Sequence, residues 1–235
     1  TDISTTLELT MVETGPVLLF EHPLSPYAQK VKLALLEKQV PFETVNLATM
    51  TDAERIQFVT WNHRAEVPVL TDNGFAIYDS TVILQYIEER WPSPELLPAA
   101  PQDRARVRML EEIVDTHFEA NTWGLSEVLH FGRATDGLAS ALIDYGVSEI
   151  RQWLAWLNVQ LGDRRYFNGA KFGWGDLCVV PFVNGATRFD VYPLANTPLA
   201  EWLQTVNERP HVIACKQAAE AWELDPALMA AALES

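Results

Sequence analysis

The chain has 235 residues, of which 48% are hydrophobic and 21% charged, a mixture typical of globular proteins with a sizeable core. Its formal net charge of -15 repels phosphate backbones and anionic lipids, so we expect neither nucleic acid nor a membrane as a partner. No apolar run approaches the length of about 20 residues that spans a bilayer, and the first 16 residues do not resemble a secretory signal.

The N-terminal part of the chain alternates strand and helix patterns, after an extension over residues 1–16. Residues 17–20 are a compact apolar run typical of a buried strand, and Pro26 opens a helical pattern that Ser25 would cap. A second strand is predicted over residues 42–47. Since two strands joined through a helix need a crossover connection, we expect this pair to be parallel.

A hairpin and a third helix complete the first domain. After a short helix or irregular segment over residues 52–60, two apolar runs at residues 67–70 and 75–78 flank an Asn-Gly pair, which is a strong hairpin signal. Ser80 is placed to cap the helix that follows. We therefore expect an α/β domain over residues 17–90, with a mixed four-stranded sheet.

The rest of the chain is predicted to be helical. Four prolines between residues 91 and 103 forbid a continuous helix, so this segment is taken as a linker. Residues 104–235 would then form an all-α domain. Its apolar stripes predict helices over residues 104–123, 138–161, 174–189, 198–207 and 211–222.

The first candidate site motif is Ser25-Pro26-Tyr27-Ala28, at the start of a helix. Thiol-redox proteins of this topology have Cys-Pro-Tyr-Cys here, and the helix N-terminus stabilises the thiolate of the first cysteine. Both sulfurs are absent from this chain, which excludes dithiol exchange at this position. Ser25 is then either a simple helix cap or a hydroxyl aimed at an anionic sulfur.

The second motif is the Val67-Pro68 bond at the start of a strand. A proline here suggests a cis bond that turns the Val67 backbone towards a pocket, where it would pair with a peptide-like ligand. The alternative is an ordinary edge-strand proline.

The third motif is Asp79-Ser80 at the head of the next helix. A hydroxyl and unpaired N–H groups at a helix start can bind a carboxylate, although an ordinary helix cap has the same sequence. All three motifs are expected at one edge of the sheet.

In this order, the motifs resemble the glutathione transferase superfamily, whose first domain is thioredoxin-like and whose second is helical. Residues 62–70 are similar to its Asn-Pro-x-Gly-x-Val-Pro-x-Leu segment, and Arg209-Pro210 to its late helix start. Residues 172–177 are similar to the segment that opens its core helix, with Asp176 at N3 of a capping box.

The Ser-Pro-Tyr start resembles the serine-dependent, tau-like branch of plant or bacterial cytosolic members, or omega-type members with serine for cysteine. Phe20-Glu21 stands where tyrosine-dependent classes carry their hydroxyl, which excludes that mechanism.

Some positions depart from the family pattern. Gly173 stands where serine or threonine usually caps the core helix. Glu66 stands where the family usually has lysine or glutamine, near the glycine carboxylate of glutathione, and would repel it. Arg64 or Lys38 would compensate this charge, unless Glu66 points to solvent.

The resemblance implies a role for each candidate residue. Ser25 would donate a hydrogen bond to the thiol of glutathione, the co-substrate. The peptide part of glutathione would be held by Val67, Pro68, Asp79, Ser80 and Arg64. A hydrophobic electrophile would lie between the domains, against Tyr27, Leu110, Ile113, Val114, His117 and Trp123.

Other conspicuous residues have simpler interpretations. His22 is a further candidate for the pocket, and no histidine has the spacing of a metal ligand, so no metal is expected. Cys178 and Cys215 are far apart and outside any CxxC pair, which favours a reducing compartment, the cytoplasm.

Two classes of function are compatible with these residues. The first is a homodimeric glutathione transferase that conjugates, cleaves ethers or removes halide. The second is a non-catalytic member that binds the transcription machinery, as stringent starvation proteins do. Glu66 favours the second class, whereas Ser25 and Asp79-Ser80 favour the first.

Overall fold

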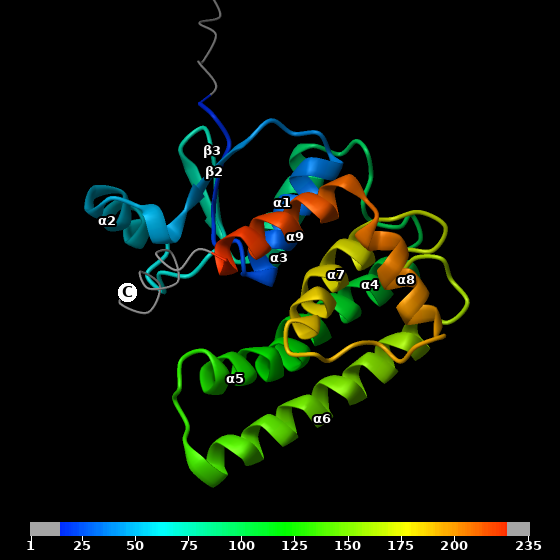
Figure 1. The fold of residues 1–235 in the computed structure, drawn as a ribbon. Helices are drawn as coiled ribbons and strands as arrows, with labels where there is room; N and C mark the ends of the chain where they lie inside the picture. Colours follow the sequence, from blue (N-terminus) through cyan, green and yellow to red (C-terminus); the bar gives the residue numbers. More distant parts are fainter. Residues whose placement is uncertain (1–14, 225–235) are drawn as a thin grey trace, which may run out of the picture.

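A computed structural model describes residues 15–224, in which a small sheet with its helices packs against a larger helical part (Figure 1). The predicted mixed four-stranded sheet and the all-α second part are both confirmed. Most of the expected extension, residues 1–16, lies outside the described residues, as do the last residues of the chain.

The sheet has the strand order β2-β1-β3-β4. Strand β1 pairs in parallel with β2 and antiparallel with β3, and β3 and β4 form the hairpin. The parallel pair is joined through α1, as expected for a crossover connection. The strands are β1 (Leu18–Glu21), β2 (Glu43–Asn46), β3 (Val69–Asp72) and β4 (Phe75–Tyr78), and the first three helices are α1 (Pro26–Glu37), α2 (Asp52–Trp61) and α3 (Ser80–Arg90).

The hairpin turn follows directly from its two central residues. Asn73 and Gly74 both have positive φ, 53° and 81°, which is the backbone that a two-residue turn between twisted antiparallel strands needs. Asparagine and glycine reach this region at little cost, so the sequence specifies the register of the hairpin.

The two faces of the sheet pack against different helices because side chains alternate along each strand. Leu19 on β1 and Leu70 on β3 point into the main core, which α1 and α3 continue into the helical part. Phe20 and Val69 point to the other face and pack with Phe58 of α2 in a smaller cluster. Both faces are therefore covered.

The helical part contains a break that the apolar pattern did not predict. The expected helix over residues 104–123 begins earlier, at Pro101, and is interrupted by a π-helical turn over Val114–Phe118. The other predicted helices are present with shifted ends. The helices are α4 (Pro101–Ile113), α5 (Glu119–Leu129), α6 (Asp136–Leu161), α7 (Trp174–Thr187), α8 (Pro198–Asn207) and α9 (Pro210–Glu223).

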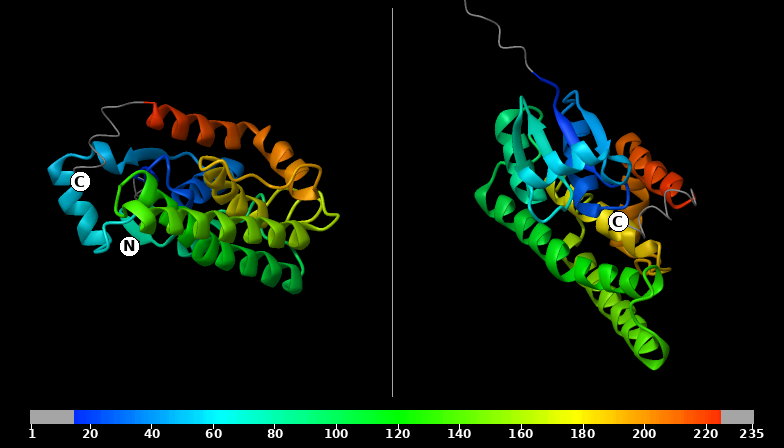
Figure 2. Two further views of the ribbon diagram at one scale, coloured as in Figure 1. Left: turned by 60° about the horizontal axis from the view of Figure 1, so that its bottom comes forward. Right: turned by 90° about the vertical axis from the view of Figure 1, so that its left-hand side faces the viewer.

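Helix α6, with 26 residues, is the longest element that the structure describes, and α5 runs beside it (Figure 2). The two together extend away from the sheet. None of the helices within residues 15–224 has the length and apolar character needed to cross a membrane.

The start of α7 is held by the buried carboxylate of Asp176. This carboxylate accepts hydrogen bonds from the backbone N–H groups of Phe167 (2.8 Å) and Gly173 (3.2 Å), and from Nε1 of Trp202 (2.8 Å). Asp176 thus stands at N3 of α7, as predicted. A Cβ atom on Gly173 would lie 2.2 Å from Nδ2 of Asn168, so the serine usual at this cap would not fit.

A buried group of charges joins α1 to the helical part. The ammonium of Lys30 on α1 is completely buried and contacts Oε1 of Glu111 (2.9 Å) and Oδ2 of Asp115 (2.5 Å). Glu111 also accepts a hydrogen bond from Nε1 of Trp174 on α7 (2.8 Å). Burial lowers the pKa of Lys30, but the two carboxylates outweigh this effect and the net pKa lies above its usual value.

Helix α1 also contacts the last described helix of the chain. Nη2 of Arg209, the residue before α9, contacts both carboxylate oxygens of Glu37 at the end of α1 (2.7 and 2.8 Å). The guanidinium of Arg209 lies 4.0 Å from the ring centroid of Phe172. Two helices from late in the sequence, α7 and α9, thus both pack on α1.

Substitution of Lys30 should destabilise the fold strongly. Lys30→Met leaves Glu111 and Asp115 buried without their cation, and removing one partner of a buried pair costs about 3–5 kcal/mol. The measurement is urea unfolding followed by tryptophan fluorescence. Lys171→Met is the control, because Lys171 is exposed and makes no ion pair in the described part of the chain, so its effect should stay within about 0.5 kcal/mol. Equal effects of the two substitutions would contradict the role given to Lys30.

Candidate active site

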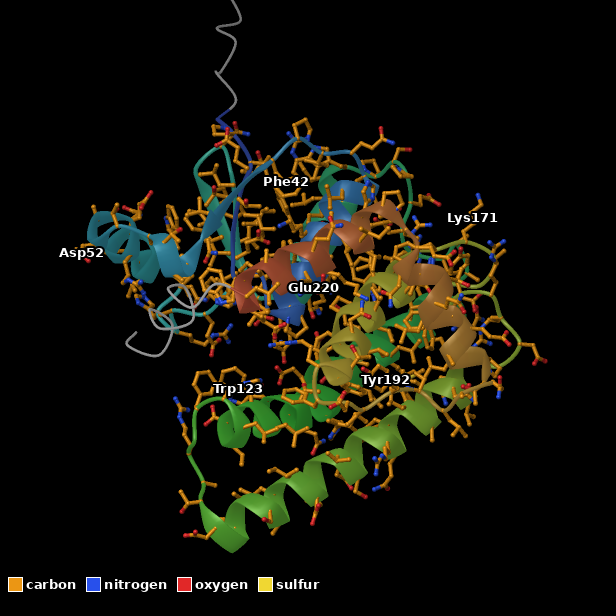
Figure 3. The ribbon with its side chains drawn as sticks, in the orientation of Figure 1. Phe42, Asp52, Trp123, Lys171, Tyr192 and Glu220 are labelled. Carbon is orange, nitrogen blue, oxygen red and sulfur yellow. The ribbon has the colours of Figure 1, made fainter. Side chains whose placement is uncertain are left out.

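A cavity of about 1010 Å³ lies between the sheet domain and helices α5, α7 and α9. Its size is that of pockets that hold small ligands. Figure 3 shows Trp123 on α5 and Glu220 on α9, which line two of its walls. The wall formed by the sheet domain carries the Ser25, Val67-Pro68 and Asp79-Ser80 motifs, so the structure brings all three together.

Ser25 is the N-cap of α1. Its Oγ accepts a hydrogen bond from the N–H of Ala28 (3.2 Å), and Pro26 at the first helical position fixes the backbone for the turn. A hydroxyl that accepts one hydrogen bond still has its own hydrogen to donate. Ser25 can therefore cap the helix and donate into the cavity at the same time.

The Val67-Pro68 peptide bond is cis, as the sequence suggested, and both residues line the cavity. Strand β3 begins only at Val69. Among residues 15–224, the loop hydrogen bonds leave the N–H and C=O groups of Val67 without a partner. An extended peptide could pair with these groups as an additional strand would.

At the start of α3, Ser80 does not occupy the N-cap position that was expected from the sequence. Asp79, not Ser80, is the N-cap of α3, and it has a positive φ of 76° without a side-chain cap hydrogen bond. Ser80 is the first residue of the helix and lines the cavity with the N-terminal turn. Its hydroxyl is therefore not used to cap α3 and is available to a ligand.

Glu66 pairs with Arg64, and its side chain is also 63% exposed to solvent. Nε of Arg64 lies 2.9 Å from Oε2 of Glu66, and Nη2 of Arg64 lies 3.4 Å from Oδ2 of Asp79. Lys38 does not compensate Glu66, because its Nζ donates to the carbonyl oxygens of Trp91 (2.7 Å) and Pro94 (2.8 Å) in the linker. Arg64 thus holds both acidic groups at the cavity edge.

The expected wall of the electrophile site on the helical domain needs correction. Tyr27 and Trp123 line the cavity, but Leu110, Ile113, Val114 and His117 do not. Leu110 and Val114 are 1% exposed and belong to the main core. His117 lies outside the cavity and stacks on the ring of Trp153, with centroids 5.4 Å apart.

A π-helical turn separates the predicted stripe from the residues that do line the cavity. The N–H of Glu119 donates to the carbonyl of Val114, five residues earlier, so one additional residue shifts the faces of the helix. A stripe continued from Leu110 and Val114 with a constant period of 3.6 residues therefore does not follow the face of α5 that lines the cavity. The residues of α5 that do line it follow helical spacing after the turn: Glu119, Thr122, Trp123, Ser126 and Leu129.

His22 and Trp222 form a wall that joins the two parts of the protein. Their rings are 4.7 Å apart and nearly perpendicular, and both line the cavity. Nδ1 of His22 accepts a hydrogen bond from the N–H of Leu24 (3.2 Å). Burial, and then the charge of Arg188 on α7, lower the pKa of His22, which favours the neutral imidazole.

Tyr27 connects Ser25 with the helical wall. Its hydroxyl donates to the backbone carbonyl of Asp115 (2.5 Å). Burial, and then the charges of Glu119 and Asp115, raise the pKa of Tyr27 well above its usual value, so the phenol keeps its proton. The ring of Tyr27 therefore forms an apolar part of the cavity wall, and its hydroxyl is already hydrogen-bonded to Asp115.

The residues around the cavity offer no metal site. No group of three His, Cys, Asp or Glu side chains in the described part of the chain is arranged to hold a metal ion.

Comparison with known proteins gives the family. Residues 19–95 match the family described as "Glutathione S-transferase, N-terminal domain", and residues 139–210 match "Glutathione S-transferase, C-terminal domain". The chain belongs to the glutathione S-transferase family. The thioredoxin-like first domain and the transferase class expected from the sequence are thereby confirmed.

Individual members support this assignment. Glutathione S-transferase U28 of Arabidopsis thaliana is 33% identical over 175 residues, which cover 72% of this chain and 72% of that protein. Maleylacetoacetate isomerase of Mus musculus is 29% identical over 184 residues, or 77% of this chain and 82% of its own. The crystal structure of a glutathione S-transferase from Rhodospirillum rubrum F11 superimposes with a TM-score of 0.73, at 28% identity, over 85% of this chain and 91% of that one.

In this family member, His22 should make stability depend on pH. Its pKa is lowered from 6.5 on folding, so the folded state binds the proton more weakly than the unfolded state. Stability contributed by neutral His22 is then lost as the pH falls below 6.5. We expect His22→Gln to lose less stability than the wild type between pH 7 and pH 5, measured by urea unfolding. Parallel losses in both proteins would show that His22 titrates as it does in the unfolded chain.

Proposed function

We propose that Ser25 donates a hydrogen bond to the sulfur of bound glutathione and so favours the thiolate that attacks an electrophile. The observation that carries this proposal is the geometry of Ser25. It caps α1 through its oxygen, keeps its hydrogen for a ligand and faces the cavity. A charge-assisted hydrogen bond of this kind lowers the pKa of a thiol.

The N-terminus of α1 adds to the same effect. The unpaired N–H groups and the positive end of the helix dipole stabilise a nearby anion. The first turn of α1 contains no acidic residue that would oppose this. A thiolate beside Ser25 would therefore meet a favourable field from the helix as well as the hydroxyl.

The peptide part of glutathione would lie along the sheet-domain wall. The unpartnered backbone groups of Val67, next to Pro68, suit its cysteinyl amide. Ser80 at the start of α3 suits the γ-glutamyl carboxylate, and Asp79 suits the ammonium of the same group. Arg64, between Glu66 and Asp79, would carry the positive charge near the ends of the tripeptide.

The electrophile would lie on the opposite wall, against Tyr27 and Trp123. Phe131 and Phe182 add apolar surface to the same cavity, which supports a hydrophobic or aromatic substrate. In each reaction the sulfur forms a bond to carbon. The leaving group differs between conjugation, ether cleavage and dehalogenation, and all three belong to the proposal.

The non-catalytic alternative loses its supporting observation. Glu66 favoured it because an unpaired carboxylate would repel glutathione, but Glu66 is paired with Arg64 at 2.9 Å.

We also propose a homodimer in a reducing compartment, the cytoplasm. Phe75, Tyr78 and Val82 expose apolar surface on β4 and α3, where a second copy would cover it by two-fold symmetry. Both cysteines are free and buried, which suits a compartment in which glutathione stays reduced.

Ser25→Ala should lower turnover and leave binding nearly intact. Loss of one stabilising donor reduces kcat about 10-fold to 1000-fold, while the affinity for glutathione falls much less because Val67 and Ser80 are unchanged. The measurements are conjugation of 1-chloro-2,4-dinitrobenzene, calorimetry with glutathione, and titration of the thiolate absorbance of the bound tripeptide. Full activity in Ser25→Ala would show that Ser25 is only a helix cap.

Ser25→Cys provides the complementary test. A cysteine at this helix start would be a stabilised thiolate that forms a mixed disulfide with glutathione. We expect this variant to lose conjugating activity and to gain thiol-transferase activity.

Glu66→Gln should tighten glutathione binding. Arg64 then no longer shares its charge with Glu66. The variant also removes a partly exposed carboxylate with the same charge as the glycine carboxylate of glutathione, which is worth about 0.5–1 kcal/mol. Calorimetry measures the change, and Arg64→Gln should shift the affinity in the opposite direction. An unchanged affinity in Glu66→Gln would mean that this carboxylate does not act on the ligand.

A further inference from the structure

Glu119, the first residue of α5, is a carboxyl group in the cavity without a described partner. It is half-buried and lines the cavity, and its side chain makes no hydrogen bond or ion pair to any residue from 15 to 224. The proposed binding of glutathione does not use it. An unpartnered carboxyl group in a ligand pocket is a candidate for proton transfer.

A hydrogen bond from Tyr27 ties the helical segment of Glu119 to the start of α1. Tyr27, two residues after Ser25, donates its hydroxyl to the carbonyl of Asp115 (2.5 Å). Asp115 lies one turn before Glu119 on the same helical segment. The hydrogen bond therefore sets Glu119 opposite the first turn of α1, on the wall where the electrophile would lie.

The protonation state of Glu119 suits an acid. Burial, and then the charge of Asp115, raise the pKa of Glu119 to about 7. A group with this pKa is protonated in a substantial fraction of molecules at neutral pH, which is the condition for efficient general acid catalysis.

The neighbouring charges do not cancel this effect. On the same helical segment, Asp115 pairs with Lys30. From α1, Tyr27 faces Glu119 as a neutral phenol, and beyond it Glu66 and Asp79 share Arg64. Across the cavity, Arg188 of α7 pairs with Glu223 of α9. Other parts of the wall are lined by the remaining titratable residues, which are His22, His130, Arg55, Lys216 and Glu220.

We propose that Glu119 is a catalytic acid that protonates the oxygen of an epoxide when the glutathione thiolate opens its ring. The proposal rests on the function proposed above and names a substrate class for the same site. An epoxide bearing an aromatic group fits best, because Trp123, one helical turn after Glu119, lines the same cavity and its ring contacts that of Phe131.

The step balances without a further reactant. The sulfur electron pair forms a bond to a ring carbon, and the carbon–oxygen bond of that carbon breaks with its electrons on oxygen. The proton of the Glu119 carboxyl group passes to this oxygen, which becomes a hydroxyl. The Glu119 carboxylate then takes a proton from water. Displacement of chloride from an aromatic ring needs no such proton.

The test compares two electrophiles on one variant. Glu119→Gln keeps the shape of the side chain but has no acidic proton. We expect kcat/KM with 1,2-epoxy-3-(4-nitrophenoxy)propane to fall about 100-fold or more, the scale of general acid catalysis. With 1-chloro-2,4-dinitrobenzene it should change less than about 3-fold. Glu119→Asp should retain more epoxide activity than Glu119→Gln, because it keeps an acid one methylene shorter.

Glu220→Gln is the matched control, since it removes a carboxylate from the opposite wall of the same cavity and should leave the ratio of the two activities unchanged. An equal loss with both electrophiles in Glu119→Gln, or an unchanged epoxide rate, would overturn the proposal. If Glu119→Gln does not fold, an unchanged activity ratio in Glu119→Asp overturns it in the same way.

The test also separates this proposal from the function on which it rests. A wild-type protein that conjugates the chloroarene but not the epoxide would contradict the role of Glu119 alone. A protein that does not bind glutathione and conjugates neither compound would contradict the proposed function itself.

Discussion

The arrangement of the cavity depends on the burial of one charge, the ammonium of Lys30. An ammonium that is wholly removed from water must find anionic partners, and here they come from the segment that runs from α4 into the π-helical turn. Apolar contacts between helices tolerate small shifts, whereas these contacts of 2.5 and 2.9 Å do not. Because Ser25 caps α1 and Tyr27 lies in its first turn, this group of charges ties the wall that carries both residues to the helical part.

The sequence predicted those parts of the fold whose cause is local. Asn73-Gly74 specifies its turn because both residues readily adopt a positive φ angle. Ser25-Pro26 specifies a helix start because the serine side chain caps the helix and the proline has a fixed φ angle. The helical wall of the site was predicted wrongly, because Leu110 and Val114 face the main core and the π-helical turn over Val114–Phe118 then adds a residue that the apolar pattern does not reveal. Glu119 was missed for the same reason: on a continuous helix it does not share the face of Leu110.

The departures from the family pattern are explained by residues that lie close to them in the sequence. Glu66 departs from the family pattern, and Arg64, one of the two residues expected to compensate its charge, contacts both Glu66 and Asp79 in the structure. Gly173 was an apparent loss of a helix cap. Its neighbour Asn168, whose Nδ2 donates to the carbonyl of Leu96 at 2.8 Å, occupies the space that a larger residue would need. The position of Asn168 does not follow from periodicity or composition, because it depends on Leu96, 72 residues earlier in the chain.

The contact between Arg209 and Glu37 has a consequence for the order in which the protein is made. Helix α1 emerges early from the ribosome, but α7 and α9, which pack on it, are synthesised more than a hundred residues later. Until then the side of α1 that α7 and α9 cover lacks these partners. Domains generally fold as units during synthesis, but the packing of α1 is complete only once α9 is available, so a chain truncated before α7 would leave an apolar surface of α1 uncovered.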